Sequence, residues 1–160
     1  MHFRIKVIPA GISDLKKLKQ LSVGAYALRS LPKELGALSQ LEGFIVSSNK
    51  ALGAAPDDVS FPPELKRMKS LHDLRLQLCG LRRVPAFVRE LSSLELIWLA
   101  DNERLQFVAP LDYLIECCPR LSKVNMKKWR RGTWTPQSLA HLEAFRAKLL
   151  AKNPSAEVEF

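Results

Sequence analysis

The residue types that most often carry catalysis or hold metal ions are few and scattered in this sequence. The three histidines are His2, His72 and His141, and two of the three cysteines are adjacent, Cys117 and Cys118. No glycine-rich phosphate loop, no HExxH motif and no CxxC pair is present. A histidine or cysteine needs a nearby partner to act as a nucleophile, a base or a ligand. We therefore expect no catalysis, no metal and no cofactor.

A basic segment offers a different chemistry, the binding of phosphate groups. Twelve consecutive residues without a carboxylate contain six cations, and two tryptophans lie within or just after them. Basic side chains interleaved with aromatic rings can bind phosphates and stack on bases. The segment is equally typical of the solvated edge of a basic domain. These residues are Arg120, Lys123, Lys127, Lys128, Arg130 and Arg131, with Trp129 and Trp134.

The overall composition predicts one folded domain that favours acidic partners. The 160 residues are 47% apolar and 26% charged, which is enough to bury a core. The net charge of +9 favours an acidic protein, nucleic acid or an anionic membrane surface. Apolar residues are spread too evenly for a transmembrane helix, and residues 1–6 lack the apolar run of a secretion signal.

The number and spacing of the cysteines indicate the redox state of the compartment in which the protein resides. Three is an odd number, and neighbouring cysteines rarely form a disulfide, so free thiols and a reducing intracellular compartment are the simplest interpretation. Delivery by a route that does not use a Sec-type signal stays open.

The elements that would position any site follow from an internal repeat. Five segments have apolar residues at their first, fourth and sixth positions. Apolar residues at the fourth and sixth positions share one face of a strand, and such a face is buried only when neighbouring strands stack. The segments begin at Leu18, Leu41, Leu71, Leu94 and Leu121, and their ninth positions are Tyr26, Asn49, Cys79, Asn102 and Trp129.

Proline-containing segments recur between these predicted strands. Pro9, Pro32 and Pro85 each follow an aliphatic residue and precede another by three positions. Together with the strand pattern they resemble the leucine-rich-repeat family, LxxLxLxxNxL followed by LPxxL, over nearly the whole chain. The resemblance implies an α/β fold, a right-handed solenoid with a parallel sheet on its concave side and an irregular or short-helical convex side.

The same resemblance implies a protein-binding module without catalysis. The LPxxL spelling is more similar to intracellular plant, protist and bacterial repeats than to secreted animal ones. A signalling scaffold, a ubiquitin-ligase adaptor, an innate-immune receptor and a bacterial effector all use such modules, and the residues do not separate these contexts.

The ninth positions predict a structural column at the point where each strand ends. The amides of Asn49 and Asn102 can satisfy buried backbone groups of the adjacent turns. Cys79 is a substitute that the family resemblance allows, because it is small and tolerates burial. Tyr26 and Trp129 depart from the pattern, so we expect the column to be weak or absent at both ends.

We expect one domain over residues 1–160, with about five repeats in residues 15–134 and a cap in residues 135–160. In the cap, Thr135 begins a helix with an apolar stripe, Asn153 and Pro154 end it, and a final strand follows. Residues 110–118 predict a short convex helix. The stripe contains Leu139, Leu142, Phe145 and Leu149, and the strand contains Ala156, Val158 and Phe160.

Residues 1–14 have two interpretations. They are either the second half of a repeat whose strand is missing, or a capping edge strand in which Phe3, Ile5 and Val7 alternate. The first interpretation implies that the chain docks onto, or continues into, other repeats at its N-terminal edge.

The candidate binding residues lie on the solvent-facing side of the predicted sheet, which we call the concave face. Fifth positions of neighbouring repeats should be direct neighbours at about 4.8 Å between strands. Arg75 can therefore stack on Trp98, which is a pairing typical of binding hot spots. The alternative is that Trp98 only covers the sheet or contacts an attached domain. The fifth-position column, which we call the concave column, is Ser22, Ile45, Arg75, Trp98 and Asn125.

Other residues should surround this pair. Leu78 and Leu96 flank it, inside a polar surround of Asp73, Gln77, Glu95 and Asp101. A basic rim of Lys123, Lys127, Lys128, Arg130 and Arg131 would lie beyond. The sequence thus predicts a protein partner, possibly acidic, on the concave face; the alternative is an accessory RNA-binding subunit that uses the rim.

Overall fold

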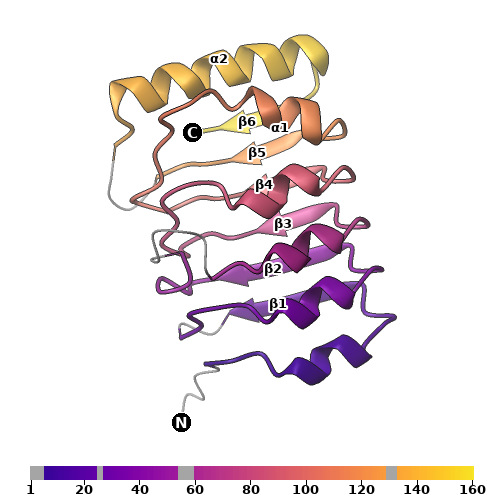
Figure 1. Cartoon of the computed structure of the whole chain (residues 1–160). Coiled ribbons are helices and arrows are strands. Elements are labelled where there is room, and N and C mark those ends of the chain that lie inside the picture. The colour runs from indigo at the N-terminus through magenta and orange to yellow at the C-terminus, as the bar shows by residue number, and fades with distance from the viewer. Residues whose placement is uncertain (1–5, 25–26, 54–59, 129–132) are drawn as a thin grey trace.

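The computed structural model describes residues 6–24, 27–53, 60–128 and 133–160 and forms one parallel sheet. The six strands are ordered as in the sequence, so each repeat adds one strand beside the last (Figure 1). Consecutive parallel strands require a connection that returns along the opposite side of the stack. The strands are β1 (Gln20–Gly24), β2 (Gly43–Ser47), β3 (Asp73–Arg75), β4 (Leu96–Trp98), β5 (Lys123–Asn125) and β6 (Glu157–Glu159).

The returning connections form a second layer of short helical turns. Each 3-10 turn follows a proline in an extended conformation, which fits a residue whose φ is fixed. Pro62 starts one turn that the three predicted proline segments did not include. The convex helix begins at Asp112, two residues later than Pro110. The turns are η1 (Ala10–Asp14), η2 (Lys33–Ala37), η3 (Pro63–Arg67) and η4 (Ala86–Glu90), followed by α1 (Asp112–Cys117).

The core lies between these two layers and confirms the predicted strand positions. Leu71, Leu74 and Leu76, the first, fourth and sixth positions of one repeat, are completely buried. Neighbouring turns also pack closely, since a Cβ on Gly36 would lie 2.3 Å from the carbonyl oxygen of Glu64. Only glycine fits at that point.

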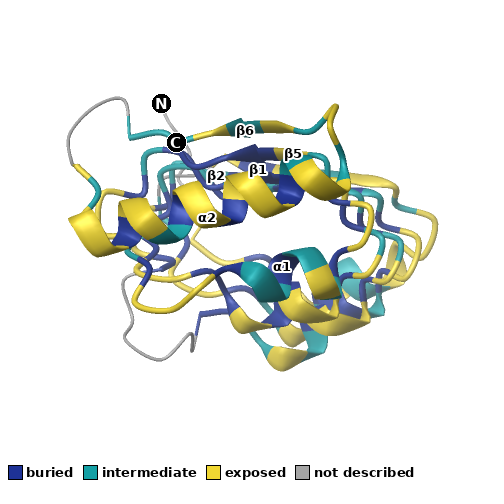
Figure 2. Cartoon of the chain, turned by 90° about the horizontal axis from the view of Figure 1, so that it is seen from above, coloured by how far each residue is buried: buried dark blue, intermediate teal, exposed yellow. Residues whose placement is uncertain are grey.

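A helix covers the C-terminal end of the stack. Helix α2 (Pro136–Lys152) lies across this end between the sheet and the convex turns (Figure 2). The Thr135 side chain accepts a hydrogen bond from the backbone N–H of Ser138, as predicted for the helix cap. The buried stripe is Ser138, Leu142, Phe145 and Leu149.

The predicted stripe was wrong at Leu139, whose side chain is exposed. Ser138 takes the inward position, because its hydroxyl accepts a hydrogen bond from the backbone N–H of Phe107 at 2.8 Å. Beyond the helix, β6 pairs with β5, and Ala156, Val158 and Phe160 pack against the core as predicted.

The first described turn buries little of its surface. Turn η1 occupies the place of a convex turn, yet none of its residues is buried. Val7 and Leu15 are exposed, and Val7 lies outside any strand. Phe3 and Ile5 lie outside the described residues. Both interpretations of residues 1–14, and docking at this edge, stay predictions.

After each of three successive strands, the residue at the eighth position of the repeat has a left-handed backbone conformation. Ser48, Leu78 and Asp101, each the eighth position of its repeat, have φ values of 60°, 56° and 55°. Aspartate tolerates this region better than leucine, for which it is uncommon. These turns place the ninth-position side chains inside the stack and set the edge of the concave face.

Candidate functional site: the concave face

The ninth-position column, which we call the turn column, is buried and internally satisfied. Asn102 Oδ1 accepts hydrogen bonds from the backbone N–H groups of Cys79 and Leu81, both at 3.0 Å. Its Nδ2 donates to the carbonyl oxygens of Leu76 and Leu99 at 2.9 and 2.8 Å. With all four bonds made inside the chain, this side chain has a structural role.

Asn49 and Cys79 continue the turn column. Asn49 Oδ1 accepts from the Leu28 backbone N–H at 3.0 Å, and its Nδ2 donates to the carbonyl oxygens of Val23 and Ser47. The Cys79 thiol donates to the Val46 carbonyl oxygen, and burial raises its pKa to about 12, so it is a neutral thiol. Tyr26 and Trp129, the predicted weak ends of the column, lie outside the described residues.

The concave column has the predicted register. Ile45 pairs with Arg75, Arg75 with Trp98, and Trp98 with Asn125 across adjacent strands. Ile97 on the opposite side of β4 is completely buried, whereas Trp98 is half-buried. The guanidinium carbon of Arg75 lies 5.5 Å from the centre of the Trp98 ring, within the range of a cation–π contact.

A carboxylate holds the guanidinium in this position. Arg75 Nε and Nη2 donate to the Asp73 carboxylate at 2.9 and 2.8 Å, a two-point arrangement that fixes the orientation of the guanidinium plane. The hydrogen bond to Asp73 raises the pKa of Arg75, so the group stays charged. Asp73, Arg75 and Trp98 form one ordered unit on the sheet.

A pocket of about 170 Å³ opens beside Trp98 toward the C-terminal strands. Asn125 is buried in its floor, because its Nδ2 donates to the Glu159 carboxylate on β6. The expectation that the Asn125 side chain faces solvent was therefore wrong, since the capping strand covers it. The pocket is lined by Leu96, Ile97, Trp98, Lys123, Val124, Asn125, Glu157 and Glu159.

Sequence reasoning missed the two glutamates of this pocket. The alternation of Ala156, Val158 and Phe160 on the core side places Glu157 and Glu159 on the concave side. That signal was present in the sequence. The sequence did not indicate that β6 pairs with β5, and this pairing brings the two carboxylates into the pocket beside Trp98.

The predicted basic rim is partly neutralised by the same strand. Lys123 lies 3.0 Å from Glu157, and Lys127 lies 3.3 Å from Glu159. Lys128 turns away from the sheet, because its Nζ lies 3.9 Å from the centre of the Trp134 ring.

Burial also lowers the pKa of Lys128. The remaining two rim residues, Arg130 and Arg131, lie outside the described residues.

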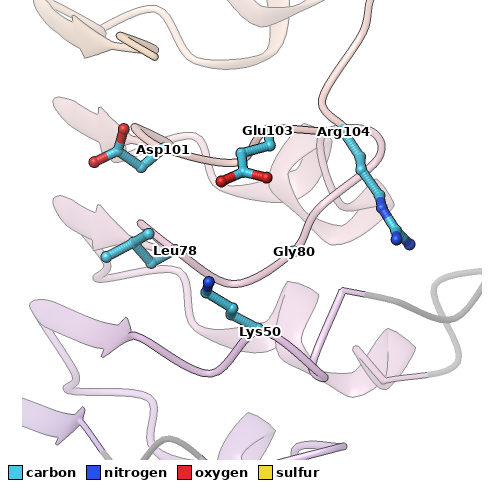
Figure 3. A pocket seen from close by; sticks show the side chains of 6 residues that line it. All are labelled: Lys50, Leu78, Gly80, Asp101, Glu103 and Arg104. Carbon is cyan, nitrogen blue, oxygen red and sulfur yellow. The ribbon is translucent and has the colours of Figure 1, made fainter. Parts of the chain in front are cut away.

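A second pocket, of about 280 Å³, lies at the edge where the strands end. Leu78 and Asp101 belong to its lining and stand on the left-handed turns, beside the strands and not on them. Figure 3 shows Lys50 and Glu103 reaching toward the loop of Leu78 from the turns on either side. The Oε1 atom of Gln77 is buried and has no hydrogen-bond partner among the described residues.

Within the described ranges, no three histidine, cysteine or acidic side chains come close enough to hold a metal ion. None of the helices there is both long and apolar enough to cross a bilayer. All three cysteines are free thiols.

Comparison with known proteins finds similarity at the level of solved structures. A leucine-rich-repeat protein of Leptospira interrogans is 18% identical, with a TM-score of 0.41, and the match covers 98% of this chain and 52% of that one. The leucine-rich-repeat domain of the type III effector XopL is 16% identical, with a TM-score of 0.45, covering 97% of this chain and 64% of that one.

An internalin from Listeria monocytogenes is 12% identical, with a TM-score of 0.42, covering 96% of this chain and 50% of that one. This chain thus spans between half and two thirds of their lengths. No family model and no curated protein matches the sequence. The parallel sheet, the turn after each proline and the buried turn column, taken together, are the fold of a leucine-rich-repeat solenoid.

Proposed function

We propose that this chain is a protein-binding module that contacts its partner through the concave face and catalyses no reaction. The observation that carries the proposal is the unit of Asp73, Arg75 and Trp98, in which a partly buried indole lies on the sheet and the guanidinium that Asp73 holds lies over it. Tryptophan and arginine dominate binding energy at protein interfaces when a partner desolvates them. A tryptophan with only a packing role would not require the cation–π contact with Arg75 on the solvent side of the sheet.

The dimensions of the sheet support a protein partner. Six strands at about 4.8 Å spacing give a surface about 25 Å wide, which suits a standard interface of about 800 Å² per partner. Ser22 and Gly24 on β1 are small and exposed, and Ser22 pairs with Ile45 on β2. We propose an intracellular role as a scaffold or recognition module, on the basis of the free thiols.

The RNA-binding alternative has less support from the contacts. RNA binding through phosphates needs several cations that are available for neutralisation. Lys123 and Lys127 already face Glu157 and Glu159, and Lys128 lies on Trp134. The rim therefore presents a mixed surface to a polyanion.

Affinity capture with the whole chain as bait, followed by binding measurements on the captured partner, tests the proposal. Trp98→Ala should weaken the complex strongly, whereas Ser22→Ala, in the same column but on β1, should not change it. Raising the salt concentration from 50 to about 200 mM should weaken the complex only modestly, because few ions are released. A partner that is RNA, with a steep salt dependence and no effect of Trp98→Ala, would overturn the proposal.

A further inference from the structure

We propose that the pocket beside Trp98 receives an arginine side chain of the protein partner. This inference rests on the proposed function and specifies the chemistry of the contact. It starts from the two faces of one indole ring. Arg75 on β3 covers one side of Trp98, and the pocket formed by β4, β5 and β6 opens on the other.

The molecule itself shows how a guanidinium binds to this ring. Arg75 lies over the indole while Asp73 accepts two of its hydrogen bonds. On the pocket side, the ring is again accompanied by carboxylates, those of Glu157 and Glu159. The second face of Trp98 therefore also has carboxylates in its neighbourhood, and these are paired with the exposed lysines Lys123 and Lys127.

The spacing of the strands leaves room for that group. Trp98 pairs with Asn125, which pairs with Glu159, so the indole and the Glu159 carboxylate are separated by two strand spacings, or about 10 Å between backbones. Asn125 between them is buried in the floor and does not fill the gap. A planar guanidinium can enter over Asn125, stack on the indole and donate to a carboxylate edge.

Each carboxylate of the pocket already faces an exposed ammonium group. Lys123 lies 3.0 Å from Glu157 and Lys127 lies 3.3 Å from Glu159, so an entering guanidinium has to displace one of these lysines. The ion pair of Lys123 with Glu157 has exposed side chains, and such pairs contribute about 0–1 kcal/mol, so an entering guanidinium displaces the lysine at little cost. A carboxylate also accepts more hydrogen bonds than one lysine supplies.

The net charge of the chain limits which arginines bind. At +9 the molecule repels polycationic segments at long range. The pocket therefore suits a single arginine in an otherwise neutral or acidic segment of the partner. A partner can therefore be acidic overall and still place one arginine in this pocket.

Nuclear magnetic resonance of the ¹⁵N-labelled whole chain tests the pocket without the natural partner. The probe is the peptide acetyl-Gly-Arg-Gly-amide, and the readout is the indole N–H signal of Trp98, assigned by its loss in Trp98→Phe. We expect a saturable shift with a dissociation constant in the millimolar range. The citrulline peptide, which has the same shape without the charge, should give no saturable shift, and the lysine peptide should bind several-fold more weakly.

Two variants of opposite expected sign sharpen the test. Glu159→Gln should weaken binding of the arginine peptide about threefold or more, and Lys123→Ala should tighten it, because a competing cation is removed. Glu143→Gln, a matched change of an exposed glutamate on α2 outside the pocket, should have no effect.

Equal shifts with arginine and citrulline would overturn the inference. So would weaker binding in Lys123→Ala, or preferential binding of acetyl-Gly-Asp-Gly-amide, because each outcome assigns the pocket to another chemistry. Loss of the captured partner by Trp98→Ala with no arginine selectivity in the peptide test would leave the proposed function standing and remove only the arginine.

Discussion

Two columns of side chains, the turn column and the concave column, cross the same repeats and differ in burial. The turn column of Asn49, Cys79 and Asn102 is buried, and its polar atoms bind backbone groups of the neighbouring turns. The concave column at Arg75 and Trp98 is ordered as well, but an indole and a pocket stay open to solvent. A side chain whose hydrogen-bonding groups are all satisfied inside the chain stabilises the fold. A side chain that keeps an exposed surface is available to a partner.

The largest effect should come from the turn column. Asn102→Ala removes four hydrogen bonds and leaves buried backbone groups unsatisfied, so the free energy of unfolding should fall by about 3 kcal/mol. Asn49→Ala, with three bonds, should cost about 2 kcal/mol. Urea denaturation followed by circular dichroism measures both. An unchanged midpoint for Asn102→Ala would remove the distinction between the two columns.

The concave column should show the converse behaviour. Trp98→Ala should change the free energy of unfolding little, because Ile97 and Leu99 fill the core on the other side of the strand. Partner binding should weaken by about 2 kcal/mol, as expected of a hot spot.

Arg75→Ala should weaken the same complex, and the two losses should be less than additive because the side chains are in contact. Titration calorimetry of the double-mutant cycle gives the coupling energy. If the Trp98→Ala chain fails to fold, Trp98 has a structural role like that of the turn column, and this prediction is wrong.

Cys79 provides a smaller test within the turn column. Its folded-state pKa of about 12 lies above the ordinary value of 9.0, because burial disfavours the thiolate. The unfolded chain therefore loses this proton first, and the stability from Cys79 is present below pH 9 and lost as the pH rises toward 12.

Cys79→Ala should cost about 1 kcal/mol at pH 7 and reduce this alkaline loss of stability. Urea denaturation across pH 7 to 11 measures both effects. An alkaline dependence that is identical in the variant would mean that another group, such as the buried thiol of Cys118, accounts for it.

The smallest effect should come from the rim. Lys127→Glu places a second negative charge beside Glu159 and should slow association with an acidic partner a few-fold at low salt. At moderate salt the dissociation rate should be nearly unchanged. Stopped-flow measurements at two salt concentrations separate the rates. If a rim variant weakens binding more than Trp98→Ala does, the rim contributes more to binding than the concave column, contrary to this prediction.

The features that could be predicted from the sequence are those that the repeat fixes. Once Leu71 and Leu94 are in register, the neighbours Arg75 and Trp98 follow, because each strand repeats the same path at a fixed spacing. The burial of Asn49 and Asn102 follows in the same way.

The features that could not be predicted depend on the cap, which has no repeat to set its register. The pairing of β6 with β5 brings Glu157 and Glu159 to the concave face, and it depends on the length and tilt of α2. The inward position of Ser138 and the turn of Lys128 onto Trp134 likewise depend on contacts between segments distant in sequence.

The difference in burial between turn η1 and helix α2 has a consequence for the dynamics of the solenoid. Each repeat touches only its neighbours, so opening of the chain can proceed one repeat at a time from whichever end is held less firmly. Turn η1 buries none of its residues, whereas α2 buries four. Amide protons of β1 should therefore exchange with solvent sooner than those of β4. The repeats that carry Arg75 and Trp98 stay closed while the first repeat frays.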